Sequence, residues 1–200
     1  MVDPDPIEQK TDEELAREAR AGSRRSFEVL ALRYKRRLFV YFRPRLGSDQ
    51  DAEDLVQETF LKLYRNIHNY DPALRFSTWL YTSANRLAIS SYRRKKTAAG
   101  RLGPEAADGS ADLAVRAAAR ETRSTGLWDA ARTLGGNQYR VLWLRYGEDL
   151  TIEEIAASIG KSRLAVRLLL HRARTNLMKR VGPAPGRAAV TVAVRETPPG

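Results

Sequence analysis

Cysteine is absent from the 200-residue sequence, and histidine occurs only twice. Without cysteine the chain forms no disulfide bond and offers no thiolate to a metal, a composition typical of soluble cytosolic proteins. The two histidines, His68 and His171, are far apart in the sequence, and His171 has no other histidine at ligand spacing. We therefore expect a cytoplasmic protein that has no metal site and uses no cofactor.

Long apolar runs are absent as well. No segment approaches the roughly 20 apolar residues that a membrane-spanning helix requires. The opening sequence, MVDPDPIEQK, is acidic and lacks the apolar core of a signal peptide. We expect no membrane span.

Acidic residues are in the minority. The sequence has 24 Asp and Glu against 35 Lys and Arg, which gives a formal net charge of +11. Such an excess favours a polyanionic partner, because Lys and Arg release counterions from a phosphate backbone. A nucleic acid and an acidic membrane surface both satisfy this charge, so its sign alone does not choose between them.

Helical periodicity and composition divide the chain into two parts. We predict an all-α protein with a four-helix domain over residues 11–96 and a smaller helical domain over 123–181. The segment 97–122 is rich in Ala, Gly, Asp and Pro, which is typical of a flexible linker. Residues 1–10 form an N-terminal tail and 182–200 a Pro-rich C-terminal tail. The helices expected in the first domain cover 11–21, 26–46, 49–66 and 76–96.

The third predicted helix, 49–66, has an apolar side and an opposite polar side. The polar side contains one apolar residue, Leu61, among Asp54, Gln57, Glu58 and Arg65. This pattern fits a protein-binding surface, but a single exposed leucine is also common and carries no meaning by itself. Acidic residues near the start of a helix also stabilise its N-terminus, so the periodicity leaves both interpretations open.

The fourth predicted helix, 76–96, combines basic and aromatic residues. Its outer side is expected to carry Thr82, Asn85, Arg86, Ile89, Arg93 and Lys96, with Trp79, Tyr81 and Tyr92 on the flanks. Cations that follow phosphates and rings that stack on bases suit single-stranded DNA. The alternative is that the final cations complement the helix dipole and that Trp79 belongs to the core. The loop at 69–75 is a candidate site for a base flipped out of the DNA stack, but no single residue in the loop identifies this function.

The segment 151–174 has the pattern of a helix-turn-helix. Thr151 and Glu154 form a capping-box pattern, Gly160 stands where a helix-ending residue is needed, and Ser162 is able to cap a second helix. Two short helices joined by a glycine turn are typical of DNA-binding domains in which the second helix enters the major groove. A purely structural helical hairpin is the alternative.

The second helix of this motif combines arginines with leucines. Arg163, Arg167, Arg172 and Arg174 suit phosphates or guanine edges, and His171 lies among them. Leu164 and Leu168 are unexpected on the same outer side. They fit either thymine methyl groups or a contact with another protein.

Several of these segments together resemble a known family. DAEDLVQETF (51–60) is similar to the segment called region 2.2 of bacterial sigma factors, and FSTWL (76–80) to the segment that follows it. WLRY (143–146) and HRAR (171–174) look like region 4. In this combination and at this distance the motifs are highly specific, and the similarity covers most of residues 11–180. The sequence therefore resembles the extracytoplasmic-function (ECF) group of the sigma-70 family.

The resemblance implies that the protein is bacterial and cytoplasmic. It also implies that one of its surfaces binds RNA polymerase. The third helix would bind the β′ clamp helices of core RNA polymerase, and the β subunit is a further expected partner. An anti-sigma factor is left open as another partner. The residues implied in polymerase binding are Asp51, Asp54, Gln57, Glu58, Leu61 and Arg65.

The resemblance also implies two promoter-DNA surfaces, one for melted and one for double-stranded DNA. The first would capture and melt the −10 element through Asn69, Tyr70, Arg75, Trp79, Thr82, Asn85, Arg86, Ile89, Arg93 and Arg94. The second would read the −35 element through Ser162, Arg163, Arg167, Leu168, His171, Arg172 and Arg174.

The sequence departs from the family pattern at two places. Where the family often has T-V-K-S-R-L before H-R-A-R, this chain has AVRLLL (165–170), so two polar positions are leucine. The usual Leu-Pro-Pro before region 4 is replaced by LGG (134–136). The first departure puts the usual −35 contacts in doubt and favours an altered −35 sequence or an additional protein contact.

Two other function classes remain as alternatives. A stand-alone DNA-binding regulator would need only the C-terminal motif and would have no use for the surface around Leu61. An enzyme acting on nucleic acid would need a catalytic group, but the sequence offers no convincing carboxylate pair, metal-ligand cluster, nucleophile–base pair or phosphate-binding glycine loop. We therefore expect no catalytic residues.

Overall fold

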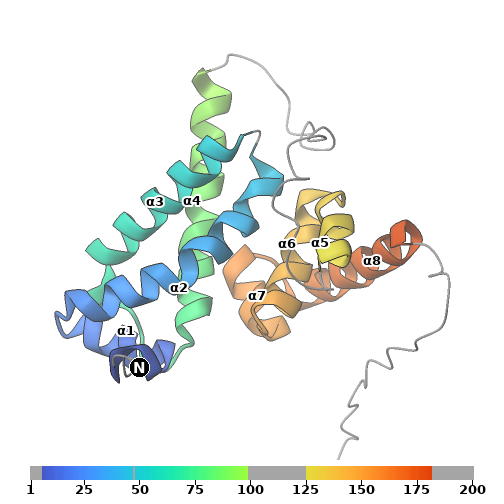
Figure 1. Cartoon of the computed structure of the whole chain (residues 1–200). Coiled ribbons are helices and arrows are strands. Elements are labelled where there is room, and N and C mark those ends of the chain that lie inside the picture. Colours follow the sequence, from blue (N-terminus) through green and yellow to red (C-terminus); the bar gives the residue numbers. More distant parts are fainter. Residues whose placement is uncertain (1–5, 47, 99–124, 182–200) are drawn as a thin grey trace, which may run out of the picture.

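The computed structural model describes residues 6–46, 48–98 and 125–181, and within these ranges every regular element is a helix. The first domain contains α1 (Asp12–Arg20), α2 (Arg24–Phe42), α3 (Asp49–Arg65) and α4 (Phe76–Ala98). The second contains α5 (Thr125–Arg132), α6 (Gly136–Leu142), α7 (Ile152–Ile159) and α8 (Arg163–Val181) (Figure 1). The all-α, two-domain prediction is confirmed. Most of the expected linker and the whole C-terminal tail lie outside the described residues.

The local start and stop signals in the sequence act as predicted. Thr11 Oγ1 accepts a hydrogen bond from the Glu14 backbone N–H at 3.2 Å, and the Glu14 carboxylate accepts one from the Thr11 N–H at 2.8 Å. Thr151 and Glu154 repeat this reciprocal cap at the start of α7. Such caps satisfy backbone N–H groups that have no partner within the helix.

Aromatic rings fill the core of the first domain. Phe76, the first residue of α4, is fully buried and has three ring neighbours within 6.0 Å: Tyr34, Tyr70 and Trp79. Trp79 is half-buried and belongs to this cluster, as the core alternative for that residue predicted. These rings anchor the first turn of α4 and thereby fix the direction of the helix.

The second domain is built around α8, which packs on α5, α6 and α7. Val166, Leu170 and Ala173 face inward, as the helical periodicity predicted. A second aromatic cluster of Trp128, Tyr139 and Trp143 joins α5 to α6 and to the π-helical turn η5 (Trp143–Gly147). This core positions the two helices of the helix-turn-helix.

The two domains pack against each other through α4 and α7, which lie side by side (Figure 1). Tyr139 in α6 adds a link to α2, because its hydroxyl donates to the carbonyl oxygen of Val40 at 3.0 Å. One side of α4 is therefore covered by its own domain and another by the second domain. This second covering decides which side chains of α4 reach the surface.

Candidate protein-binding and nucleic-acid-binding surfaces

The outer side of α3 is exposed and mixed in character. Ser48 begins the helix, since its hydroxyl accepts a hydrogen bond from the Asp51 N–H at 3.1 Å. Ala52, Leu55 and Leu63 are buried on the inner side, as predicted. On the outer side Leu61 is 58% exposed. We call the outer side the α3 surface and define it by Asp51, Asp54, Gln57, Glu58, Leu61 and Arg65.

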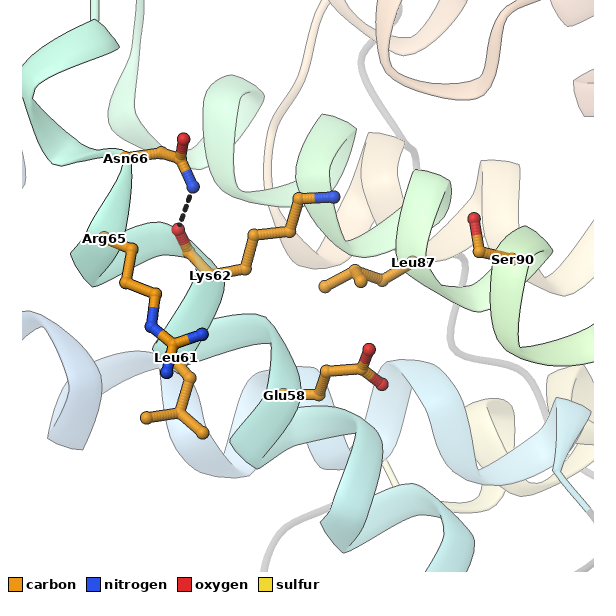
Figure 2. A pocket seen from close by; sticks show the side chains of 7 residues that line it. All are labelled: Glu58, Leu61, Lys62, Arg65, Asn66, Leu87 and Ser90. Carbon is orange, nitrogen blue, oxygen red and sulfur yellow. Dashed lines mark hydrogen bonds between the residues drawn. The ribbon is translucent and has the colours of Figure 1, made fainter. Parts of the chain in front are cut away.

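A shallow groove of about 420 Å³ lies where α3 meets α4. Leu61 and Arg65 belong to its α3 side, and Leu87 and Ser90 to its α4 side (Figure 2). Asn66 closes the end of the helix, because its side-chain amide donates to the Lys62 carbonyl at 2.7 Å. The groove thus places the apolar side chain of Leu61 beside the charged side chains of Glu58 and Lys62.

Part of the predicted −10 surface is exposed. Asn69, Arg75, Arg86 and Ile89 reach the surface, and Thr82 is half-buried. Arg93 and Arg94 belong to α4, but their side chains lie outside the described residues. The exposed residues combine cations with an apolar side chain along one helix and the loop before it.

Tyr70 differs from the sequence expectation, because it is only 1% exposed. Its hydroxyl donates to the Leu74 carbonyl at 2.6 Å, and its ring packs on Phe76 and Trp79. Burial raises the pKa of the Tyr70 phenol to about 12. Tyr70 therefore shapes the 69–75 loop from inside, and its ring is not presented to a base in this conformation.

Asn85 also differs from the sequence expectation, which placed it on the outer side of α4. The residue is 1% exposed and lies between the two domains. Its amide oxygen accepts from the Tyr41 hydroxyl at 2.8 Å and from Arg140 Nη1 at 3.1 Å, and its amide nitrogen donates to the Ser158 carbonyl at 3.1 Å. The helical periodicity of α4 identifies only the side that faces its own domain. It gives no sign that α7 of the second domain covers the side that carries Asn85.

A buried carboxylate forms the centre of a second polar contact between the domains. Glu148, just before α7, is 2% exposed, and its carboxylate pairs with Arg37 of α2 at 2.6 Å. The hydroxyl of Tyr81 in α4 donates to the same carboxylate at 2.7 Å. Burial raises the pKa of Glu148, while the Tyr81 and Arg37 hydrogen bonds oppose that rise. Sequence reasoning missed Glu148 and Arg37, since nothing local distinguishes them from surface charges.

Two further hydrogen bonds join the edge of the same interface. The Thr78 hydroxyl of α4 donates to the Glu154 carboxylate at 2.9 Å, and Arg75 Nη1 donates to the Asp149 carbonyl at 2.8 Å. Burial opposes ionisation of Glu154, but hydrogen bonds from the Thr151 backbone and the Thr78 hydroxyl lower its pKa overall. Arg75 thus reaches the second domain from the predicted −10 loop.

The outer side of α8 is exposed from Arg163 to Arg174, and together with the capping residue Ser162 this stretch contains all the residues of the predicted −35 surface. Ser162 caps the helix by accepting from the Ala165 N–H at 3.2 Å, and Gly160 before it has a φ of +65°. The exposed side chains on this stretch are Arg163, Leu164, Arg167, Leu168, His171, Arg172 and Arg174. The structure therefore brings the predicted −35 residues together on one helix.

The described residues contain no cluster of three or more His, Asp or Glu side chains able to hold a metal ion. None of the described helices combines the length and apolarity needed to cross a bilayer.

Two family models match the chain. The model described as Sigma-70 region 2 matches residues 30–98, and the model described as Sigma-70, region 4 matches residues 130–179. Together they cover more than half of the sequence, and the first contains both α3 and α4 whereas the second contains the helix-turn-helix.

Curated and solved proteins show the same similarity. The chain is 30% identical over 172 residues to the ECF RNA polymerase sigma factor BldN of Streptomyces coelicolor, covering 83% of this chain and 64% of BldN. It is 31% identical over 159 residues to the RNA polymerase sigma factor YlaC of Bacillus subtilis, covering 78% of this chain and 92% of YlaC. In fold it resembles the sigma factor RpoE of Bartonella quintana, solved in complex with the anti-sigma factor NepR, with a TM-score of 0.62 at 19% identity, covering 78% of this chain and 96% of RpoE.

Proposed function

Because the chain belongs to the sigma-70 family, in its ECF group, we propose that it binds core RNA polymerase and directs transcription initiation at specific promoters. The observation that carries the proposal is the presence of two different exposed surfaces on two domains of one chain. The α3 surface carries acidic residues and Leu61, whereas α8 carries arginines within a helix-turn-helix.

The α3 surface is the proposed polymerase-binding site. Leu61 supplies an apolar anchor, and Asp54 and Arg65 supply charges at its rim. Apolar anchors near the centre of an interface contribute most of its binding energy, and rim charges mainly set orientation and association rate. The proposed partners are the β′ clamp helices and the β subunit of core RNA polymerase.

The exposed part of α4 and the loop before it are the proposed site for the melted −10 element. Arg75 and Arg86 would follow phosphates, and Ile89 would pack on an unstacked base. Asn85, Tyr70 and Trp79 are less accessible, so their contact with DNA requires that α7 leave α4 or that the 69–75 loop open.

The outer side of α8 is the proposed reader of the −35 element. The N-terminal half of the second helix of a helix-turn-helix enters the major groove, and this is the half that carries Arg163, Arg167 and Arg172. Arginine binds phosphates and guanine edges. We include an anti-sigma factor among the proposed partners, since RpoE is bound to one in its solved complex.

The test is transcription in vitro with core RNA polymerase and genome-wide mapping of the resulting start sites. We expect initiation at a defined set of promoters that share −35 and −10 sequences. Failure to initiate at any site, with and without added cell extract, contradicts the proposal.

The α3 surface is tested by Leu61→Glu, with Leu32→Glu as the matched control. Leu32 is 75% exposed on α2 and lies outside all proposed surfaces. We expect Leu61→Glu to weaken polymerase binding about 30-fold or more, the effect of losing a hot-spot side chain, and Leu32→Glu to leave it unchanged. In a stand-alone regulator neither substitution would change DNA binding, and the protein would bind its promoter without polymerase.

A further inference from the structure

Two leucines face outward on the N-terminal half of α8. Leu164 is 66% exposed and Leu168 is 50% exposed, four residues further along the helix. Residues four apart lie on the same side of an α-helix. The inward positions of this helix are occupied by Val166 and Leu170, so the two leucines are not part of the core. We call Leu164 and Leu168 the leucine pair.

The surroundings of the leucine pair are cationic. Arg167 and Arg172 are exposed, and within the described part of the chain neither forms a hydrogen bond or an ion pair. Arg163 meets only the exposed carboxylate of Glu153, at 3.5 Å. Unpaired cations on both sides of an apolar pair favour a polyanionic occupant, because a protein partner would have to leave these charges unpaired or supply matching acidic groups.

We propose that the leucine pair recognises thymines in the −35 region of the promoter by packing on their 5-methyl groups. The inference rests on the proposed role of α8 in the major groove. A leucine side chain neither donates nor accepts a hydrogen bond, and the thymine methyl is the apolar group that base edges present in that groove. A leucine placed against the edge of another base would leave the donors and acceptors of that edge without partners, at a cost in affinity.

The spacing of the pair predicts the spacing of the thymines. Four residues of α-helix rise about 6 Å. Successive bases along one strand are about 3.4 Å apart. Leu164 and Leu168 are therefore expected to meet two thymines about two base-pair steps apart, whereas Arg167 and Arg172 contact phosphates or guanines beside them.

The first experiment selects preferred sequences from a library. Holoenzyme is assembled from the full chain and bacterial core RNA polymerase and is offered duplex promoters with a randomised −35 region. We expect enrichment of thymine at two positions about two steps apart. Leu164→Ala and Leu168→Ala should each remove the preference at one of them and leave the other preferences in place. Both substitutions keep a good helix former at an exposed position, so α8 is expected to fold.

The second experiment removes only the methyl groups, by replacing each selected thymine with deoxyuridine. We expect affinity of the unsubstituted holoenzyme to fall about fourfold per methyl, the value for one buried methyl group. In the matching leucine variant the replacement should have no effect, so the two changes are not additive. Met178→Ala serves as control, because Met178 is 76% exposed on the C-terminal half of the same helix.

The outcomes separate this inference from the proposed function. If Arg167→Ala and Arg172→Ala lower affinity for −35 duplexes but deoxyuridine has no effect, the thymine inference is overturned and −35 reading stands. If the arginine variants also have no effect, the −35 role of α8 fails. If the leucine variants weaken binding to core polymerase without changing base preference, the pair contacts protein and the thymine inference is likewise overturned.

Discussion

At the scale of single residues, the most unusual group is the carboxylate of Glu148. It is buried between the domains and is held by Arg37 and by the Tyr81 hydroxyl. A buried charge that loses its partner is costly, because the remaining group is removed from water without compensation. Removing one partner of this contact should therefore destabilise the protein mainly because the remaining group has lost its partner.

The first prediction concerns Glu148→Ala. We expect it to lower the free energy of unfolding by about 1–3 kcal/mol, below the range for fully buried pairs because Arg37 is 39% exposed and water can hydrate it. Urea denaturation measures the change. Glu28→Ala is the control, because Glu28 pairs with Arg24 on an exposed helix face, and we expect a change of no more than about 0.5 kcal/mol there.

The second prediction concerns pH. The pKa of Glu148 is raised in the folded protein above its usual value of 4.5, mainly by burial. The folded state thus holds this proton more tightly than the unfolded state, so the associated stability is present below pH 4.5 and is lost as pH rises through the raised pKa. As pH rises above 4.5, the melting temperature of the unsubstituted protein should therefore fall relative to that of Glu148→Gln, whose amide does not titrate. A difference that stays constant with pH contradicts the prediction.

At the scale of elements, the helix-turn-helix depends on local signals at each end of α7. The Thr151–Glu154 cap begins the helix, and Gly160 ends it with a φ of +65°. Apart from the adjoining backbone, no atom would lie within 4 Å of a Cβ added at Gly160. The cost of another residue there is therefore conformational, since L-residues with a side chain disfavour this region of backbone space.

The third prediction follows from this geometry. Gly160→Ala should lower the free energy of unfolding by about 1 kcal/mol, and Gly160→Asn by less, because asparagine tolerates the left-handed conformation better. Gly126→Ala, in the helix α5 and equally free of neighbours, should leave stability unchanged or raise it. Chemical denaturation of the three variants provides the comparison. If Gly126→Ala lowered the free energy of unfolding as much as Gly160→Ala, the left-handed backbone conformation of Gly160 would not be the cause of the destabilisation.

At the scale of the whole molecule, the two domains share a polar interface. Asn85, Glu148 and Thr78 each bond across it. Interfaces of this kind within one chain resemble transient protein contacts and allow the domains to separate. Separation would expose Asn85 and the side of α4 that α7 covers.

The fourth prediction concerns this separation. Glu148→Ala should increase the radius of gyration in X-ray scattering and strengthen binding to a single-stranded −10 oligonucleotide, because a larger fraction of molecules then presents the covered side of α4. Glu28→Ala should change neither quantity. Stronger DNA binding without expansion, or expansion without stronger binding, contradicts the link between the two.

Much of the fold follows from local sequence signals. The helices of the first domain, both capping boxes, the glycine turn and the exposure of Leu61 depend on residues close together in the chain. The positions of Asn85 and Glu148 do not. Asn85 is polar and lies off the apolar stripe of α4, so periodicity places it outside. Its partner Ser158 is 73 residues away, and a helical wheel contains no information about such contacts.

The same limit applies to Tyr70. A tyrosine in a turn between two helices fits either a base-stacking ring or a core ring, and its Phe76 and Trp79 contacts depend on how the loop folds back. By contrast, all predicted −35 residues are exposed on α8 or at its cap, because a single helix and its cap determine their arrangement.

The shared hydrogen bonds of Asn85 have a thermodynamic consequence. Its amide nitrogen faces the Ser158 carbonyl of α7, so a DNA base and α7 cannot occupy the same position on α4. Two ligands that exclude each other weaken each other by the same factor, whichever binds first. A ligand that separated the two domains would therefore raise the affinity of α4 for a single strand, and the single strand would raise the affinity for that ligand by the same factor.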